Sequence, residues 1–255
     1  MSKSKKLVVG NWKMNPLTYK EAEDLYLSIW DGVGKCKNVN VAITVPLVFL
    51  RGLSLIKKSN VSLGAQDCFP GEIGPFTGAV SVRMIKELGV QFVIIGHSER
   101  RAMGDSDQLI NEKIKSALLN NLKVVVCVGE SIRDESGDYL NFIKNQLITD
   151  LSKVKRNLLK NLMVAYEPVW AIGKDALRPA VPEDAVEVAI FIKKVISEIF
   201  GRAVGIKVPV IYGGSVDPKN CGNYLHDGVI NGFLVGRASL SSEKFLEIIK
   251  ITDEI

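Results

Sequence analysis

The 255-residue sequence predicts a single α/β domain, residues 1–255, folded as a closed (β/α)₈ barrel. Three observations support this prediction. The length is that of one such barrel, short apolar runs alternate with amphipathic segments, and eight apolar runs can be counted. A doubly wound open sheet is the alternative, because periodicity alone does not count strands securely. No GxGxxG sequence opens a helix, which favours the barrel.

The predicted strands are short and rich in β-branched residues. Near-continuous apolar runs of this length are typical of parallel strands covered on both faces. They span 7–9, 41–43, 61–63, 92–95, 124–126, 162–165, 208–211 and 232–235. Between them, apolar residues lie three and four positions apart, as on one face of a helix. Two such stripes are Ala22, Leu25, Tyr26 and Ile29 in segment 19–30 and Ala185, Val188, Ala189 and Ile192 in segment 182–200.

Composition narrows the class of protein. The net charge of +5 suits an anionic ligand but is also common on ordinary surfaces. The densest basic run, 153–160, is expected to coat a solvated helix rather than to bind nucleic acid. No apolar run approaches the roughly 18 residues of a membrane span, and 7–10 is too short for a signal-peptide core. The spacing of the four cysteines and the two histidines indicates neither disulfides nor a zinc site, so we expect a cytoplasmic protein.

In such a barrel, residues just beyond the carboxyl ends of the strands build the active site. Asn11 and Lys13 follow the first run, and alternation along an extended segment points both side chains the same way. A capping asparagine beside a solvated lysine is the simpler alternative.

His97 follows the fourth run, and Ser98 and Glu99 open the next segment. A lone histidine is more often structural than catalytic. A ring at a helix N-terminus, however, feels a positive potential that favours neutral imidazole, and neutral imidazole can donate a hydrogen bond to a carbonyl. His97 is therefore a candidate electrophile.

Glu167 follows the sixth run, where a buried and unpaired carboxylate would be costly unless it had a partner or a function. Pro168 restricts the backbone of Glu167 to extended conformations and so directs its side chain. The apolar stretch 169–172 has the character of a lid that could exclude water. An ordinary loop whose glutamate caps a helix is the alternative.

Glycine-bearing turns follow the seventh and eighth runs, at 213–215 and 236–238. Loops at these two places form the usual phosphate site of such barrels, because bare backbone N–H groups can approach the oxygens. Each turn alone is weak evidence, since glycine is common in tight turns. Together they favour a phosphorylated ligand.

Six motifs, in order and at the family's spacing, make the chain similar to the triosephosphate isomerases from about residue 6 to the C-terminus. They are Gly-Asn-Trp-Lys-Met-Asn (10–15), Gly-His-Ser-Glu-Arg-Arg (96–101), Cys-Val-Gly-Glu (127–130), Ala-Tyr-Glu-Pro-Val-Trp-Ala-Ile-Gly (165–173), Tyr-Gly-Gly-Ser-Val (212–216) and Gly-Phe-Leu-Val-Gly-Arg-Ala-Ser-Leu (232–240). The resemblance implies a TIM barrel that interconverts dihydroxyacetone phosphate and D-glyceraldehyde 3-phosphate through an enediol(ate), in glycolysis and gluconeogenesis. It implies neither a metal nor an organic cofactor.

The resemblance also implies roles for individual residues. Glu167 is expected to be the general base and His97 the neutral electrophile. Lys13 is expected to supply the positive charge, Asn11 an amide in the same pocket, and Glu99 a neighbouring carboxylate. The substrate, and above all its phosphate, is expected to bind Asn11, Lys13 and the backbone of Gly173, Ser215, Gly236 and Arg237. The lid is expected at Pro168, Val169, Trp170, Ala171 and Ile172, and it is latched by Tyr212 and Ser215.

A further segment resembles the loop by which two subunits of the family interlock. It comprises Gln66, Phe76, Thr77 and Gly78, and the threonine of that loop reaches the neighbour's site. A surface Ω-loop is the alternative. By resemblance we expect a homodimer. From the composition and the apolar runs we expect neither nucleic acid nor a membrane as partner.

Two departures from the family pattern matter. The lid tip, 174–177, is about two residues longer than usual and lacks the second glycine, so we expect lid timing to differ while the chemistry is unchanged. Arg237 stands where many relatives carry glycine, but its backbone N–H remains available for phosphate.

Two other functions remain as alternatives. Another phosphate-binding barrel enzyme, an aldolase or a synthase, is one; an aldolase would need a Schiff-base lysine at a strand end, and only Lys13 is a candidate. A non-catalytic phosphate-binding barrel is the other, and it would be expected to lack Glu167 or His97.

Overall fold

The computed structural model describes residues 5–34, 36–56, 60–172 and 178–255. Within these ranges, parallel strands close into a barrel in which each strand pairs with the next and the last pairs with the first. The strands are β1 (Lys6–Asn11), β2 (Val39–Val45), β3 (Val61–Ala65), β4 (Phe92–Ile95), β5 (Lys123–Val128), β6 (Leu162–Tyr166), β7 (Val210–Tyr212) and β8 (Gly232–Val235). Each predicted run overlaps one strand, so the predicted (β/α)₈ barrel is confirmed.

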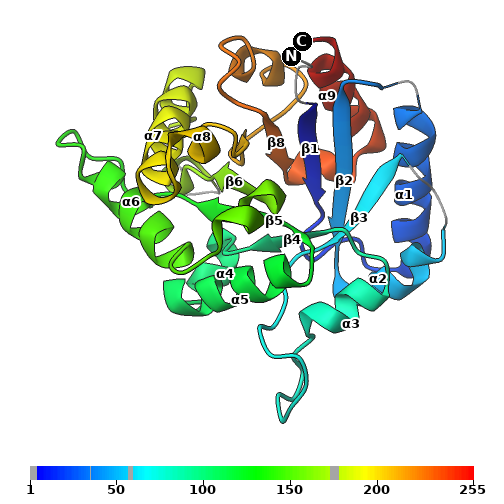
Figure 1. Cartoon of the computed structure of the whole chain (residues 1–255). Coiled ribbons are helices and arrows are strands. Elements are labelled where there is room, and N and C mark those ends of the chain that lie inside the picture. Colours follow the sequence, from blue (N-terminus) through cyan, green and yellow to red (C-terminus); the bar gives the residue numbers. More distant parts are fainter. Residues whose placement is uncertain (1–4, 35, 57–59, 173–177) are drawn as a thin grey trace.

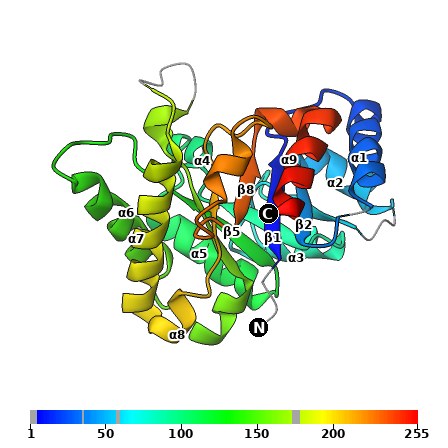
Figure 2. The ribbon, with the colours of Figure 1, turned by 90° about the horizontal axis from the view of Figure 1, so that it is seen from above.

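Helices form a ring around the barrel (Figure 1), and the view from above shows them on opposite sides of the strands (Figure 2). The α-helices of the described residues are α1 (Tyr19–Val33), α2 (Leu47–Ser54), α3 (Val82–Glu87), α4 (Ser98–Ala102), α5 (Asp107–Leu119), α6 (Asp138–Asp150), α7 (Pro182–Phe200), α8 (Arg202–Gly205) and α9 (Ser242–Glu254). Short 3₁₀ helices are η1 (Arg156–Asn161), η2 (Val169–Ala171), η3 (Cys221–Tyr224) and η4 (Arg237–Leu240).

Helices α1 and α7 pack on the barrel through the two predicted stripes. All four predicted positions of α7 are buried, and in α1 only Leu25 is partly exposed. Helix α1 begins with a capping box, in which the Thr18 side chain accepts from the N–H of Glu21 and the Glu21 carboxylate accepts from the N–H of Thr18. Helix α7 begins at Pro182, whose fixed φ suits a first helical position.

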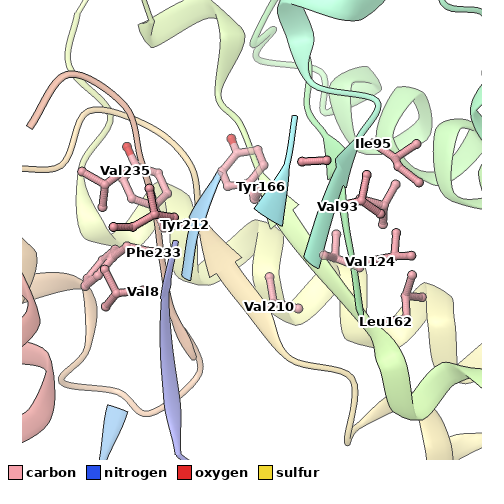
Figure 3. Packing of buried hydrophobic residues seen from close by; sticks show 14 of the residues in the cluster. Val8, Val93, Ile95, Val124, Leu162, Tyr166, Val210, Tyr212, Phe233 and Val235 are labelled. Carbon is pink, nitrogen blue, oxygen red and sulfur yellow. The ribbon is translucent and has the colours of Figure 1, made fainter. Parts of the chain in front are cut away.

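The core has two layers, because neighbouring residues of a strand point to opposite faces. The outer layer lies between strands and helices, and Figure 3 shows part of it around Val8, Val93 and Val124. The inner layer contains strand residues only: Leu7, Val9, Ala42, Phe92, Ile94, Val125, Cys127, Met163, Ala165, Ile211 and Leu234. On β1 and β6 the next inward positions are therefore 11 and 167, at the carboxyl ends of these strands.

Three expectations need correction. Strand β7 begins at Val210 rather than at 208, since Pro209 has no N–H to give to the ladder. The basic run 153–160 is largely solvated but forms a turn and η1 rather than an α-helix. Strand β1 ends at Asn11, and Lys13 has a φ of 53°, in the left-handed region. The segment from Asn11 to Lys13 is therefore not extended, and the alternation of an extended strand does not determine where the Lys13 side chain points.

The described residues contain no helix that is long and apolar enough to span a membrane. Nor, within the same ranges, do three or more His, Cys, Asp or Glu side chains gather as ligands of a metal ion. The four cysteines are free thiols, and Cys68, Cys127 and Cys221 are buried.

Candidate active site

Glu167 lies at the carboxyl end of β6, at the inward position that follows Met163 and Ala165. The residue is 2% exposed. Its Oε2 accepts a hydrogen bond of 2.9 Å from the backbone N–H of Ser98. Its Oε1 is buried and has no hydrogen bond within the described part of the chain. Burial of an uncommitted carboxylate oxygen is costly, which indicates a functional group rather than a helix cap.

His97 faces Glu167 from the end of β4. Its Nε2 lies 3.2 Å from Glu167 Oε1, and its Nδ1 accepts from the N–H of Glu99 at 3.2 Å, as the N-cap of α4. A ring nitrogen that accepts a hydrogen bond carries no proton, so this bond assigns the proton of the ring to Nε2. The predicted place at a helix N-terminus is confirmed, and the ring directs a donor toward the space beside Glu167.

Lys13 and Asn11 are brought together at the end of β1. The Lys13 ammonium pairs with Glu99 Oε1 at 2.6 Å, and the Lys13 N–H donates to Asn11 Oδ1 at 3.0 Å. Gln66 Nε2 donates to the carbonyls of Lys13 and Thr44, at 2.9 and 3.1 Å. Asn11 therefore does cap a local N–H, as the simpler alternative held. Lys13, however, is ion-paired and partly buried rather than a solvated lysine.

Backbone N–H groups at the ends of β7 and β8 are free for a ligand. Within the described residues, the N–H groups of Ser215 and Gly236 form no hydrogen bond. A Cβ added to Gly236 would lie 3.6 Å from Lys13 Cε, so the end of β8 adjoins the Lys13 side chain. Arg237 is exposed at the start of η4. Gly173, the remaining predicted phosphate residue, lies outside the described residues.

Two glycines that the sequence analysis did not single out for this purpose make room for Glu167. A Cβ on Gly129 would lie 1.7 Å from the Glu167 carbonyl oxygen, and one on Gly213 would lie 3.0 Å from Glu167 Cγ. Gly129 and Gly213 are the inward positions that follow Cys127 and Ile211. The alternation of strand residues could have predicted both roles.

The first part of the predicted lid is anchored beside the site. Trp170 is 7% exposed, and its Nε1 donates to Glu130 Oε1 at 2.6 Å. The Tyr166 hydroxyl donates to the same oxygen at 2.8 Å. Burial raises the pKa of the Glu130 carboxyl, although these donors and the charge of Arg133 act against the shift. The tip of the predicted lid, 174–177, lies outside the described residues.

Cys127 lies inside the barrel next to Glu167. Burial, and after it the negative charge of Glu167, raise the pKa of the Cys127 thiol well above its usual value. Cys127 therefore stays a neutral thiol. Glu167 therefore remains the candidate acid–base group on this side of the site.

Arg101 fixes the turn that carries His97. Its guanidinium donates to the carbonyls of Gly96 and Cys127, at 2.8 and 2.9 Å, and pairs with Asp150 at 2.7 Å. These bonds tie the end of β4 to the end of β5. Arg100 and Glu130 also make ion pairs, Arg100 with Asp67 and Asp105, and Glu130 with Arg133.

The segment predicted to contact a second subunit projects from the body between β3 and α3 (Figure 1). Phe76 is 47% exposed and packs against Phe69, with ring centroids 4.4 Å apart. Thr77 and Gly78 are exposed, and Ile73 nearby is 86% exposed. Exposed large apolar side chains in one projecting loop are typical of a protein contact surface.

A carboxylate, a neutral imidazole and an ammonium meet at one rim of the barrel, beside free backbone N–H groups. These groups suit proton transfer in a phosphorylated carbonyl compound. Fold and site thus define the class: a (β/α)₈-barrel enzyme of acid–base chemistry.

Comparison with known proteins identifies the family. Residues 6–252 match the family model described as Triosephosphate isomerase. The triosephosphate isomerase of Alkaliphilus oremlandii is 40% identical over 248 residues, with 96% of this chain and 98% of the relative covered. That of Carboxydothermus hydrogenoformans is 41% identical with the same coverage, and that of Fusobacterium nucleatum is 39% identical over 96% of this chain and 97% of the relative. The chain belongs to the triosephosphate isomerase family, as the motifs predicted.

The space that Gly213 leaves beside the Glu167 side chain gives a first prediction. In Gly213→Ala the new methyl group would lie 3.0 Å from Glu167 Cγ and push the side chain by a few tenths of an ångström. We expect kcat for triose phosphate isomerisation to fall about tenfold, with little change in melting temperature, since small misplacements of a reacting group are costly. In the control Gly222→Ala, the nearest atom to the new methyl group lies at 3.7 Å, and kcat should not change. Equal kcat values in the two variants would contradict the claim that Glu167 needs the space beside Gly213.

Proposed function

We propose that this chain interconverts dihydroxyacetone phosphate and D-glyceraldehyde 3-phosphate with Glu167 as the base that moves the proton between the two carbons. The observation that supports this role best is the buried Glu167 Oε1, uncommitted within the described residues and 3.2 Å from His97 Nε2. A base must have an oxygen that can accept a proton, and Oε1 makes no hydrogen bond of suitable geometry within the described residues, although the His97 ring lies beside it.

The chemistry assigns a role to each neighbour. A C–H beside a carbonyl is a weak acid, so its removal develops negative charge on the carbonyl oxygen. The N–H of His97 and the ammonium of Lys13 stabilise that charge, and loss of one such donor costs about 3–4 kcal/mol in other enzymes. Glu167 then returns the proton to the neighbouring carbon, which completes the isomerisation. Because the reaction is a redox-neutral proton transfer, it requires no organic cofactor.

Asn11 and Glu99 support Lys13 in this scheme. Asn11 Oδ1 accepts from the Lys13 N–H, and the Glu99 carboxylate holds the Lys13 ammonium at 2.6 Å. A lysine held at one place loses less rotamer freedom when the substrate binds. We therefore propose that both residues keep Lys13 aimed at the substrate.

Substrate phosphate binds at the free backbone N–H groups of Ser215 and Gly236, with Gly173 and Arg237 as further members of the same site. Bare amides suit a phosphate dianion, and Lys13 beside Gly236 adds positive charge. The lid, which begins with residues 168–172, closes over the substrate so that water does not reach the enediol. Tyr212 and Ser215 latch the lid when it is closed.

A homodimer completes the proposal. Phe76, Thr77 and Gly78 of one subunit insert next to the partner, and the threonine approaches the partner's site. The exposed loop supports this arrangement, as do Met14 and Leu17 near Lys13, each 91% exposed. Gln66 belongs to the same contact while it also binds the Lys13 carbonyl.

We further propose that residues 1–255 form one domain and that the enzyme works in the cytoplasm, where its four free thiols stay reduced.

Isomerase activity provides the test of the proposed base. We expect Glu167→Gln to lower kcat by about 10²- to 10⁴-fold with KM little changed, because an amide cannot accept the proton although it fits the same space. The measurement is a coupled assay of glyceraldehyde 3-phosphate isomerisation. Glu183→Gln, an exposed glutamate in the first turn of α7, is the matched control and should keep full activity. A folded Glu167→Gln enzyme with more than about a tenth of the activity would rule out the proposed base.

The same assay separates the isomerase from an aldolase. Borohydride added with substrate traps a Schiff base as a stable lysine adduct, and Lys13 is the candidate for such an adduct. We expect no mass increase on Lys13, because the proposed mechanism forms no bond between lysine and substrate.

The subunit contact gives a further prediction. Phe76→Arg should place a charge in an apolar interface and shift the protein from dimer to the 28.0 kDa monomer in sedimentation velocity, with loss of activity in proportion. Phe142→Arg on α6 is a close control, since Phe142 and Phe76 are 48% and 47% exposed. Phe142→Arg should remain dimeric and active. A wild-type chain that sediments as a monomer would contradict the proposed dimer.

A further inference from the structure

Tyr224, on η3, joins two parts of the proposed lid mechanism. Its ring stacks on that of the proposed latch Tyr212, with centroids 4.3 Å apart and planes inclined by 16°. Its hydroxyl donates to the carbonyl of Ala180 at 2.8 Å. Ala180 lies in the segment that leads from the lid into α7, just before the helix begins at Pro182. Tyr224 is 4% exposed, so the phenol is part of the packed interior.

The two tyrosine hydroxyls form a chain. They lie 3.4 Å apart, and burial raises the pKa of both phenols, so each keeps its one proton. Tyr224 gives its proton to the closer acceptor, the Ala180 carbonyl, which leaves Tyr212 as the donor to Tyr224. The hydroxyl that is proposed to latch the closed lid is therefore engaged with Tyr224 in this arrangement.

Arg178 holds the same segment from another side. Its guanidinium donates to both carboxylate oxygens of Asp184, at 2.7 and 3.2 Å. It also lies over the ring of Trp170, 4.5 Å from the centroid. The segment after the tip is thus bound to α7, to η3 and to the first part of the lid at once.

We propose that Tyr224 is a positioning residue for the isomerase reaction: it holds Ala180 and the Tyr212 hydroxyl together in an arrangement that must be broken before Tyr212 can latch the lid. The inference rests on the proposed function of the lid. A ligand that binds only when the lid is latched has its Kd raised by the competing arrangement, because part of the protein is then not competent to bind it. The Kd rises by about the equilibrium ratio of the arrangement held by Tyr224 to the latched one. One net hydrogen bond corresponds to about a two- to tenfold factor.

The experiment removes the hydroxyl alone. Tyr224→Phe keeps the ring on Tyr212 but frees both the Ala180 carbonyl and the Tyr212 hydroxyl. We expect the Kd of 2-phosphoglycolate, whose carboxylate stands in for the enediolate, to fall about two- to tenfold in calorimetric titration. Tyr212→Phe should raise the Kd, because that variant loses the latch itself.

Tyr26→Phe is the matched control, since its hydroxyl also bonds a backbone carbonyl, that of Val61, at the other end of the barrel. It should leave the Kd unchanged. Arg178→Lys, which breaks the two-pronged bond to Asp184, should lower the Kd as Tyr224→Phe does. If Tyr224→Phe lowers the melting temperature while the Kd stays at the wild-type value, Tyr224 is structural only and the proposal is overturned. A wild-type chain without isomerase activity would overturn the proposed function instead.

Discussion

Closure of the parallel barrel fixes where each inward-facing side chain beyond a strand end must lie. Because strand residues alternate between two faces, Met163 and Ala165 fill the interior and Glu167 takes the next inward place, at the rim. The strands on either side of β6 reach the same level with Gly129, which leaves space for the backbone carbonyl of Glu167, and with Gly213, which leaves space for its side chain. The position of Glu167 therefore follows from strand register rather than from the conformation of a loop.

Closure of the barrel also buries a carboxylate that has few hydrogen bonds at the rim. A carboxylate that is 2% exposed is held by one backbone N–H, that of Ser98, while its other oxygen stays uncommitted within the described chain. Such a group opposes folding, and the rest of the barrel must offset its cost. The bonds of Arg101 to the ends of β4 and β5 supply rigidity at this point, because they fix the turn from which His97 faces Glu167.

Most of the fold was predictable because its signals are local. Apolar runs identified the strands, and the three- and four-residue stripes identified α1 and α7. Contacts that join distant segments were not predictable in this way. Nothing in the sequence near Ser98 signals its bond to Glu167, and nothing near Tyr224 signals its contacts with Ala180 and Tyr212. The left-handed Lys13 was missed because a non-glycine residue at positive φ has no marker in the sequence.

The site itself was predicted through motifs more than through physics. Taken alone, Asn11 and Lys13 were better explained as a capping asparagine and a solvated lysine. A site was indicated only when the polar residues after several strands were considered together. One departure from the family pattern lies in the lid tip and the other is Arg237 after β8, and the described residues that follow the tip are held by contacts of Arg178 and Tyr224.

A crystal structure of the chain with 2-phosphoglycolate tests the central claim most directly. The account predicts the phosphate at the N–H groups of Ser215 and Gly236, the carboxylate of the ligand against His97 Nε2 and Lys13 Nζ, and Glu167 released from Ser98 to face the ligand. A ligand bound away from this rim, or a Glu167 carboxylate that stays on Ser98 and makes no contact with the bound ligand, would contradict it.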